Sequence, residues 1–580
     1  MSLLNVTGLS IRYAGAAAVN ELSFVVEGGE SVGLVGESGS GKTQTAMAIL
    51  GLLPANATAA GSIRLDDTEL LGASQATLNG LRARKMAIVF QDPMQALNPF
   101  VRVGAQIRHV LVQHKLADGV QARRQVIEML ERVGLPDAER QYRAYPHQLS
   151  GGMRQRAMIA AALIAGPELL IADEPTTALD VTVQAQILEL LADIRQDTAL
   201  LLITHDLGVV AGHCERILVI EGGRLVEQGA TRDVFAHPQH SYTATLLAAA
   251  PRLDRVAVPT GTAGEAVLQV DAMSVSYAER NHGQLHAVRG VDLVVRAGET
   301  IAVVGESGSG KSSLAKAALG LVPMQAGRAV FCGTELPARL EDRDRDARKG
   351  MQLVFQDPLG SLNPQMRVAA IIAEPLLVHE PGITAAERHE RSVAILARTG
   401  LGAEYLDRYP HELSGGQAQR VAIARALILR PRVLVCDEAV AALDGTVREQ
   451  ILALLREVQR ESGLAIIFIS HDLAVVRSIS HRVLVMYMGA LVELADNDAL
   501  FAAAQHPYTR ALLQAVPIPD PEHAGGKATL RGEIPSALSP PSGCTFHPRC
   551  AHAQDICKSE TPTQRTVNGT TVACHFAGEL

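Results

Sequence analysis

The chain has 580 residues, which is too long for a single hydrophobic core and predicts several domains. Apolar residues make up 47% and charged residues 20%, a composition typical of a folded globular protein rather than a disordered or fibrous one. There are 53 basic and 61 acidic residues, and the net charge of −8 argues against a nucleic-acid-binding surface that covers the whole molecule.

The first residues, MSLLNVTGLS, contain no basic stretch followed by a long apolar one, so we expect no secretory signal. No apolar run reaches the length of about 18 residues that predicts a membrane-spanning helix. These two observations predict a cytoplasmic protein. In that reducing compartment, structural disulfides are not expected among the seven cysteines.

One long stretch of sequence is present twice. GESGSGKT at residues 36–43 returns as GESGSGKS at 305–312, and the later landmarks recur at an offset of 264 to 269 residues. A repeat of this length predicts two copies of one domain rather than a solenoid. The predicted boundaries are residues 1–251 for the first domain, 252–266 for a linker, 267–520 for the second domain and 521–580 for a cysteine-bearing tail.

Short apolar runs precede the polar residues that recur in both copies. SVGLVG, ELLIAD and ALLLITHD in the first half correspond to TIAVVG, RVLVCD and LAIIFISHD in the second. Runs this short, rich in Val, Ile and Leu and separated by helical stretches, predict buried parallel strands. The predicted fold class is therefore α/β, with functional residues at the carboxyl ends of the strands.

The duplicated glycine-rich stretch fits the phosphate-loop pattern of P-loop nucleotide hydrolases. Its glycines allow backbone amides to turn toward a phosphate, Lys42 can bridge the β- and γ-phosphates of ATP, and the Thr43 hydroxyl can bind Mg²⁺. The alternative interpretation is a flexible Gly/Ser turn that precedes a lysine by chance. The phosphate-loop pattern recurs after a predicted strand in both copies, which disfavours that alternative. The predicted nucleotide-binding residues here are Gly36, Ser38, Gly39, Ser40, Gly41, Lys42, Thr43 and Gln44, and in the second half Gly305, Ser307, Gly308, Ser309, Gly310, Lys311, Ser312 and Ser313.

An acidic pair ends a later strand in each copy, Asp173-Glu174 and Asp437-Glu438. The first carboxylate of each pair can hold the Mg²⁺ shell, and the second can orient or deprotonate the attacking water. Acidic pairs at strand ends often have no function. Here each pair follows a phosphate loop in the same copy, which favours a functional role.

The most discriminating feature is LSGGMRQR at 149–156 and LSGGQAQR at 413–420. A serine and two glycines before a helix offer a hydroxyl, free amides and the helix dipole to a phosphate, although a helix N-cap alone would use the same residues. The residues concerned are Ser150, Gly151, Gly152, Ser414, Gly415 and Gly416. With this motif, residues 1–520 resemble the nucleotide-binding domains of ABC transporters.

The resemblance implies roles for further residues. Tyr13 and Tyr277 resemble the aromatic residue that stacks on adenine. Asp180 and Asp444 resemble the loop residue that couples the two ATP sites, and His205 and His471 resemble the switch histidine that contacts the γ-phosphate. With Glu174 and Glu438, the histidines form the expected catalytic set. The expected Mg²⁺ contacts are Thr43, Gln91, Asp173, Ser312, Gln356 and Asp437, and the expected cofactors are ATP and Mg²⁺.

The resemblance also implies a head-to-tail pairing of the two domains within the chain. One composite site would join Lys42 to Ser414, and the other would join Lys311 to Ser150. The second half reads DEAVAALD where the first reads DEPTTALD. The loss of the proline alters a turn but removes no charged group, so we expect two competent sites. If their rates are unequal, we expect the second site to be the altered one.

Segments outside the catalytic motifs resemble the dipeptide, oligopeptide and nickel importer family. They include FQDPMQALNP, FQDPLGSLNP, YPHQLSGG, YPHELSGG, HSYTATLLAAAP and HPYTRALLQAVP. The resemblance implies an ATPase of a peptide importer, bound to the cytoplasmic face of the bacterial inner membrane, with two permeases and an extracytoplasmic solute-binding protein. Glutathione, nickel or a metal chelate, and opines are alternative substrates.

A ribosome-associated ABC ATPase is a more distant alternative. Its known types have a long charged linker or an N-terminal cysteine cluster, whereas this chain has a short neutral linker, an acidic charge balance and C-terminal cysteines. No nucleic-acid partner is therefore expected.

Four cysteines lie near the end of the chain, with five, six and sixteen residues between them. Zinc sites usually begin with cysteines about two to four residues apart, so the spacing does not favour zinc. Four thiolates could also bind an iron–sulfur cluster, or stay free in a loose tail. The resemblance to the importer family favours a [4Fe–4S] cluster on Cys544, Cys550, Cys557 and Cys574.

Overall fold

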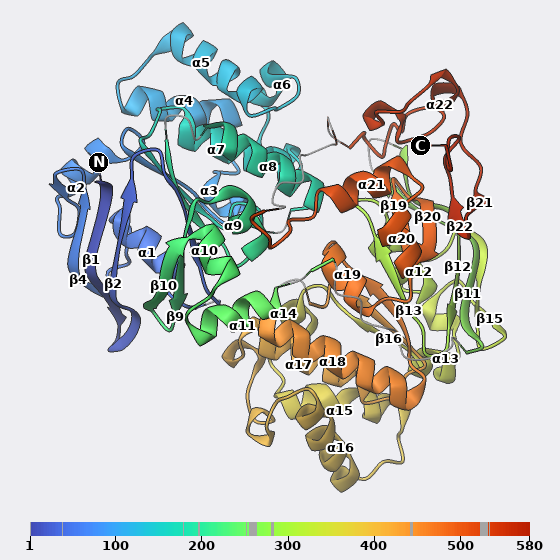
Figure 1. The fold of residues 1–580 in the computed structure, drawn as a ribbon. Coiled ribbons are helices and arrows are strands. Elements are labelled where there is room, and N and C mark those ends of the chain that lie inside the picture. Colours follow the sequence, from blue (N-terminus) through green and yellow to red (C-terminus); the bar gives the residue numbers. More distant parts are fainter. Residues whose placement is uncertain are drawn as a thin grey trace. The chain divides into compact units, whose positions relative to one another are not determined.

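The computed structural model describes residues 2–37, 39–177, 179–194, 198–250, 252–253, 264–279, 283–440, 443, 445–522, 530, 532 and 534–579. They form two compact units, residues 1–250 with 517–528 and residues 251–516 with 529–580. Figure 1 shows both units as mixed α/β structures, as the sequence predicts. Ser38, Asp444 and most of the predicted linker lie outside the described residues.

The first unit is built on a six-stranded sheet with the order β10-β9-β3-β8-β7-β6. Its middle strands β3, β7 and β8 are five residues long and buried throughout, because they have a layer of structure on each face. The five strands from β9 to β6 are parallel, and β10 is antiparallel. The strands are β3 (Ser31–Val35), β6 (Met86–Val89), β7 (Leu169–Asp173), β8 (Ala199–Ile203), β9 (Arg216–Glu221) and β10 (Arg224–Ala230).

A second, antiparallel sheet of the first unit has the order β2-β1-β4-β5. Its alternating apolar residues share one core with α1 and with one face of the six-stranded sheet. The strands are β1 (Ser2–Tyr13), β2 (Ala16–Glu27), β4 (Ala57–Leu65) and β5 (Thr68–Glu69).

Most helices of the first unit pack on the face of the six-stranded sheet that points away from the antiparallel sheet. Figure 1 shows α4, α5 and α6 gathered with α7 on one side of the unit, and their apolar residues form one core with the second face of the six-stranded sheet. The helices are α1 (Lys42–Ile49), α2 (Gln75–Leu81), α3 (Pro93–Ala96), α4 (Val103–Gln113), α5 (Gly119–Arg132), α6 (Ala138–Arg143), a 3₁₀ turn (Pro146–Gln148), α7 (Gly151–Leu163), α8 (Val181–Ile194), α9 (Leu207–His213), α10 (Thr231–Ala236) and α11 (Ser241–Ala249).

The second unit repeats this design with a larger sheet of the order β16-β17-β18-β13-β19-β20-β22-β21 and an antiparallel sheet β12-β11-β14-β15. The five strands from β16 to β19 are parallel, which confirms the predicted buried parallel strands in this half too. The strands are β11 (Ala266–Glu279), β12 (Gly283–Arg296), β13 (Thr300–Val304), β14 (Ala326–Phe331), β15 (Thr334–Leu336), β16 (Met351–Val354), β17 (Val433–Asp437), β18 (Ala465–Ile469), β19 (Arg482–Tyr487), β20 (Ala490–Asp496), β21 (Arg565–Val567) and β22 (Thr570–Val572).

The helices of the second unit follow the same order as those of the first. The apolar residues of α15, α16 and α17 form one core with one face of the larger sheet. The helices are α12 (Lys311–Ala318), α13 (Arg345–Gly350), α14 (Pro358–Ser361), α15 (Val368–His379), α16 (Ala385–Arg398), α17 (Gly415–Leu427), α18 (Gly445–Ser462), α19 (Leu473–Ile479), α20 (Asn497–Ala503), α21 (Pro507–Gln514), α22 (Asp555–Ser559) and 3₁₀ turns at Leu340–Asp342, Ala403–Tyr405, Pro410–Glu412 and His547–Arg549.

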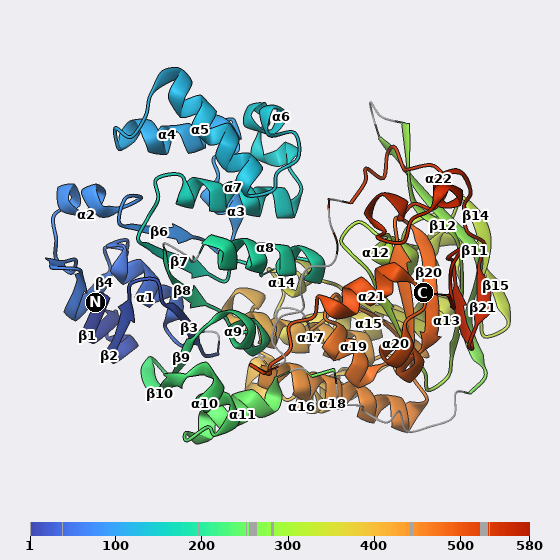
Figure 2. The ribbon, with the colours of Figure 1, turned by 45° about the horizontal axis from the view of Figure 1, so that its top comes forward.

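The C-terminal segment, residues 534–579, folds onto the second unit. Its strand β22 pairs antiparallel with β20, with Val572 opposite Glu493 and Thr571 opposite Leu494. Figure 2 shows this segment, with α22 and β21, on the β20 side of the second unit. Strands β21 and β22, which lie in the predicted cysteine-bearing tail, therefore complete the larger sheet.

Across the described ranges, no helix combines the length and the apolar character needed to span a bilayer.

Candidate functional site

Each phosphate loop lies between a central strand and a helix, β3 and α1 in the first unit and β13 and α12 in the second. Gly41 and Gly310, directly before the helices, have φ angles of 94° and 99°. A Cβ atom at Gly41 would lie 2.5 Å from the Ala18 carbonyl oxygen, and one at Gly310 would lie 2.1 Å from that of Ala287. Only glycine fits this tight turn, which sets the entry into the helix.

The lysines of the two loops are buried and fold back over the loop. Lys42 Nζ donates hydrogen bonds to the carbonyl oxygens of Gly36 (2.8 Å) and Glu37 (2.8 Å). Lys311 Nζ makes the same contacts with Gly305 (2.8 Å) and Glu306 (2.9 Å). Each ammonium group is therefore held inside the loop, where a phosphate can replace the carbonyl oxygens as its partner.

The predicted Mg²⁺ ligands of each loop meet the first residue of an acidic pair. Thr43 Oγ1 donates to Asp173 Oδ1 at 3.3 Å, and Ser312 Oγ donates to Asp437 Oδ1 at 2.9 Å. Burial raises the pKa of Asp173 to about 6, and the Thr43 hydrogen bond opposes that rise. The pKa of Asp437 is also raised by burial. A divalent cation beside these carboxylates would reverse the shift, since its charge favours the ionised form.

Glu174 lies at the centre of a small polar network. Its carboxylate accepts hydrogen bonds from Gln91 Nε2 (2.9 Å) and Thr177 Oγ1 (2.9 Å), and His205 Nδ1 lies 3.2 Å from its other oxygen. Burial raises the pKa of Glu174, but its hydrogen bonds with His205 and Thr177 and the positive charge of Lys42 outweigh burial and lower the pKa. The ionised carboxylate is the form that can accept a proton from water.

The second unit repeats this network around Glu438. Gln356 Nε2 donates to Glu438 at 2.8 Å, and His471 Nδ1 lies 3.4 Å from its other oxygen. Burial opposes ionisation of Glu438, but its hydrogen bonds with His471 and Gln356 and the positive charge of Lys311 outweigh burial and lower its pKa. The residue that corresponds to Thr177 is Ala441, which has no hydroxyl group.

These groups meet because of the strand order. Gln91, Glu174 and His205 follow β6, β7 and β8, which are neighbours in the sheet beside β3 and its phosphate loop. The carboxyl ends of parallel strands lie at one edge, so residues far apart in sequence come together there. The backbone N–H of Glu174 also donates to the Ile203 carbonyl at 2.8 Å, which ties the end of β7 to β8.

The two predicted adenine-stacking tyrosines contact the helix that follows the phosphate loop. The Tyr13 hydroxyl donates to the side-chain oxygen of Gln44, and the Tyr277 hydroxyl lies 3.1 Å from Ser313 Oγ. Both tyrosines are half-buried and lie beside the nucleotide loops. Stacking on adenine stays a prediction.

The signature serines are exposed N-caps of long helices. Ser150 Oγ accepts from the Met153 N–H at 3.2 Å at the start of α7, and Ser414 Oγ accepts from the Gln417 N–H at 3.3 Å at the start of α17. Gly151 and Gly415 have open space around them. The N-cap interpretation is therefore confirmed for both serines, and the phosphate-binding role of these helix starts stays a prediction. Asp180 lies at the start of α8, where its carbonyl accepts from the Gln184 N–H at 2.8 Å.

The four C-terminal cysteines line one pocket, together with His506, His547, His552 and His575. All four are free thiols, and the Cys544 N–H donates to the Cys557 carbonyl at 2.8 Å. Burial raises the pKa of Cys544 to about 11, and burial also raises the pKa values of Cys550 and Cys574. Within the described parts of the chain, no group of three His, Cys, Asp or Glu side chains is arranged to hold a metal ion.

Sequence reasoning missed two contributors to the sites. Thr177 lies three residues after Glu174, and its hydroxyl donates to the Glu174 carboxylate at 2.9 Å. Arg549 contacts Glu306 of the second phosphate loop across 243 residues of sequence. A comparison of the two halves residue by residue would have found Thr177 opposite Ala441, whereas no sequence pattern indicated Arg549.

Comparison with known proteins gives a consistent result. A family model described as "ABC transporter" matches residues 19–177 and 288–441, and one described as "Oligopeptide/dipeptide transporter, C-terminal region" matches residues 226–280 and 492–557. The chain is 44% identical over 565 residues to the glutathione import ATP-binding protein GsiA of Pectobacterium atrosepticum, covering 90% of each chain. It is also 44% identical over 528 residues to the peptidoglycan transport ATP-binding protein YejF of Agrobacterium fabrum, covering 88% of this chain and 96% of that one.

Both matching regions of the first model begin before a phosphate loop and end within or beside the corresponding acidic motif. The matched regions contain Glu174 and Glu438 with their glutamine partners, while His205 and His471 follow them in sequence. The GsiA of Salmonella typhimurium matches 92% of this chain at 42% identity. The chain belongs to the ABC transporter ATP-binding family, as an ATPase with two such domains in tandem and oligopeptide/dipeptide-transporter regions after each.

Proposed function

We propose that this chain is the ATP-hydrolysing subunit of an importer for dipeptides or oligopeptides. The observation that carries the proposal is the duplicated network of loop lysine, Mg²⁺-binding hydroxyl, acidic pair, glutamine and histidine, in a chain that also matches the oligopeptide/dipeptide transporter region. Relatives named for glutathione import and for peptidoglycan transport support a peptide-like cargo.

Within each half, the chain's own residues divide the work of phosphoryl transfer. Lys42 holds the β- and γ-phosphates, while Thr43 and Asp173 would hold Mg²⁺, which neutralises charge on the phosphates when bound. Glu174 accepts a proton from the attacking water, and His205 orients Glu174 and contacts the γ-phosphate. Lys311, Ser312, Asp437, Glu438 and His471 have the same roles in the second half.

The assignment of the two glutamates is tested by single substitutions. Glu174→Gln removes the base while keeping a side chain that can still contact His205, and it lowers turnover at its own site about 100-fold. Total ATPase activity therefore falls to about half or less for Glu174→Gln and for Glu438→Gln. Wild-type hydrolysis in either variant would contradict the assignment.

We further propose that the two domains pair head to tail, so that Ser414 closes the Lys42 site and Ser150 closes the Lys311 site. The exposed N-cap hydroxyls and glycine-rich starts of α7 and α17 support this arrangement, because each offers unoccupied amides and a helix dipole to an anion. Closure on two ATP molecules would then move the permeases, and hydrolysis would reset them.

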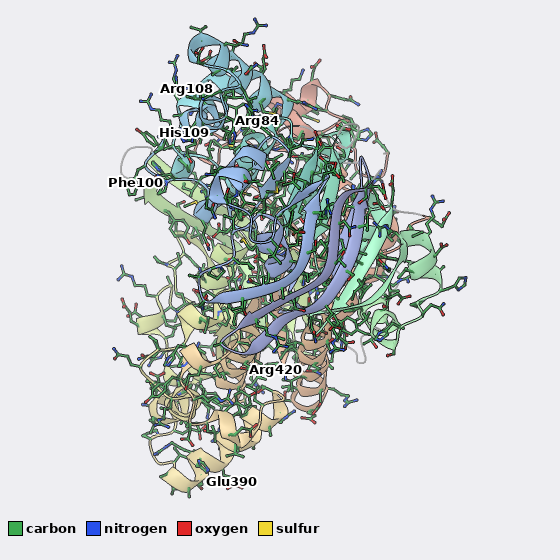
Figure 3. The ribbon with its side chains drawn as sticks, turned by 90° about the vertical axis from the view of Figure 1, so that its left-hand side faces the viewer. Arg84, Phe100, Arg108, His109, Glu390 and Arg420 are labelled. Atoms are coloured by element: carbon green, nitrogen blue, oxygen red, sulfur yellow. The ribbon has the colours of Figure 1, made fainter. Side chains whose placement is uncertain are left out.

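Exposed apolar side chains near each loop glutamine in the sequence support a permease partner. In the first unit, Met94 and Phe100 are 44% and 88% exposed, and in the second, Phe355 and Leu359 are 39% and 45% exposed. Figure 3 shows Phe100 at the surface of the first unit, on the same side as Arg108 and His109 of α4. Exposed apolar side chains that gather on one surface mark interaction sites, and in each half these residues lie within about ten positions of the loop glutamine.

The proposed partners are two membrane permeases and an extracytoplasmic solute-binding protein, which would place the chain at the cytoplasmic face of the inner membrane. Affinity purification of the tagged chain from detergent-solubilised membranes should recover two hydrophobic permeases. Recovery of ribosomes instead would favour the ribosome-associated class. Uptake of labelled dipeptides, glutathione and a nickel chelate by cells with and without the gene would then decide among the substrate classes.

We also propose that the four C-terminal thiols hold a [4Fe–4S] cluster. The support for the proposal is that four free cysteines line one pocket, which is the donor set of such a cluster. Anaerobically purified protein should contain iron and acid-labile sulfide and absorb broadly in the visible range, and Cys544→Ser should lose both. Colourless protein with stoichiometric zinc, or with no metal, would contradict this proposal.

A further inference from the structure

An arginine of the C-terminal segment forms a buried ion pair with the second phosphate loop. Arg549 Nη1 and Nη2 donate to the two carboxylate oxygens of Glu306 at 2.6 and 2.9 Å. The two side chains are 3% and 1% exposed. Two parallel hydrogen bonds between a guanidinium and a carboxylate fix the orientation of both groups, which a single point charge does not.

Glu306 is the second residue of GESGSGKS, and its backbone is engaged on both sides. Its N–H donates to the Tyr508 hydroxyl at 2.9 Å. Its carbonyl oxygen accepts from Lys311 Nζ at 2.9 Å and from the Ser309 N–H at 3.1 Å. The position of Glu306 therefore determines the position of the lysine that binds phosphate.

Arg549 is itself fixed to the cysteine-lined pocket. It lies in the short stretch between Cys544 and Cys550, and its N–H donates to the Phe546 carbonyl at 3.0 Å. Phe546 packs against Tyr487 and Tyr508, with ring centroids 5.3 and 5.4 Å apart. The stretch that carries the first two cysteines is thus packed directly behind the phosphate loop of its own unit.

The burial of this pair is not explained by stability alone. A buried ion pair contributes little compared with apolar residues of the same volume, because both charges lose their water. Burial opposes the charge of Arg549, and the contacts with Glu306 outweigh it, so that the pKa of the guanidinium stays above its ordinary value. The ion pair instead fixes the orientation of the Glu306 side chain within the phosphate loop.

Arg549 supports the loop of the second unit, and the first unit shares the tyrosine contact. In the first unit, the Glu37 N–H donates to the Tyr242 hydroxyl at 3.1 Å, so the tyrosine contact is present in both units. Glu37 is half-buried, whereas Glu306 is buried. The cysteine-bearing segment packs in the second unit, on the loop that contains Glu306.

We propose that Arg549 is a positioning residue for the second phosphate loop, so that nucleotide affinity at Lys311, and not at Lys42, depends on the C-terminal segment. The proposal rests on the family assignment of the phosphate loops and not on the identity of any group bound by the cysteines.

The experiment measures binding of a fluorescent ADP analogue with Mg²⁺ to the full chain, because ADP contacts the loop and is not hydrolysed. Binding at the second loop is measured in a Lys42→Ala background and binding at the first in a Lys311→Ala background. Arg549→Met and Glu306→Met should each weaken binding at the second loop about tenfold, as expected for a displaced phosphate-binding group, and leave the first unchanged. Arg549→Lys keeps the charge without the two-pronged geometry and should give an intermediate affinity.

Glu306→Met separates positioning from direct electrostatics. A carboxylate in the loop repels phosphate, so its removal would tighten binding if charge alone mattered, whereas positioning predicts weaker binding. Tighter binding in Glu306→Met, equal losses at both loops, or unchanged affinity in Arg549→Met would each overturn the proposal.

A matched control separates positioning from general destabilisation. Glu299→Gln breaks another ion pair of the same unit, with Arg482 at 2.6 Å, at the opposite end of β13 from the loop. It should lower the melting temperature while leaving ADP affinity unchanged. If Arg549→Met does not fold, Arg549→Lys decides, and a loss of melting temperature without a loss of affinity in that variant would show that the pair is merely structural.

Discussion

A single side chain distinguishes the surroundings of the two proposed catalytic carboxylates, Glu174 and Glu438. Glu174 and Glu438 have φ angles of 46° and 49° and the same glutamine and histidine partners. The visible sequence difference, proline against alanine, lies next to them. The chemical difference is the hydroxyl of Thr177, which the first half has and the second lacks at Ala441.

Thr177→Ala should therefore lower turnover at the first site. A hydrogen bond of this kind contributes about 1 kcal/mol, and its loss leaves Glu174 less well oriented, so we expect about a two- to fivefold decrease. The measurement is ATPase activity in a Glu438→Gln background, which isolates the first site. Thr177→Ser keeps the hydroxyl and serves as the control. Equal activity of the alanine and serine variants would contradict a role for this hydroxyl.

At the scale of elements, the same signature helix packs differently in the two units. A Cβ atom at Gly152, near the start of α7, would lie 2.8 Å from Val183 Cγ1 of α8. At Gly416, near the start of α17, the nearest atoms would be 3.5 Å away, which is ordinary van der Waals contact. The first signature therefore needs glycine for packing, whereas the second has room for a methyl group.

Gly152→Ala should destabilise the chain by about 2 kcal/mol through overpacking, and Gly416→Ala should not. Thermal unfolding followed by circular dichroism measures the difference, which corresponds to a decrease of roughly 4–8 °C in the first transition. Adding Val183→Ala to Gly152→Ala should restore most of the loss, because it removes the clashing methyl group. An equal loss in both glycine variants would show that the clash is not the cause.

At the scale of the whole molecule, the head-to-tail proposal makes a prediction about pairs of substitutions. Lys42 and Ser414 would belong to one site, so Lys42→Ala with Ser414→Ala should lose little more activity than Lys42→Ala alone. Lys42→Ala with Ser150→Ala damages both sites and should lose about tenfold or more beyond the single variant. Steady-state ATP hydrolysis of the three proteins tests this directly, and the reverse pattern would place each serine with the loop of its own half.

Sequence alone predicted the α/β class, the parallel strands and the residues that gather around each phosphate loop. These predictions succeeded because the groups occupy short motifs that directly follow buried strands, so a local pattern fixes both their chemistry and their place in the sheet. Glu174, Gln91 and His205 are the clearest examples. Arg549 could not be found this way, because a lone arginine has no pattern and its partner is 243 residues distant.

The packing of the C-terminal segment was not evident either. Strands β21 and β22 are three residues each, too short for a reliable periodic signal, and they form by pairing with β20 rather than through their own propensity. These residues become strands because β20 provides the edge on which β22 pairs.

The pairing of β22 with β20 also has a consequence for how the protein is made. A ribosome releases β20 well before residues 570–572 exist, so for that interval the sheet has an open edge that can pair with another chain. Arg549 is likewise synthesised long after Glu306. A nascent or truncated chain that ends before residue 549 therefore contains Glu306 without its arginine partner, and by the proposal above its second phosphate loop lacks the support that the complete chain provides.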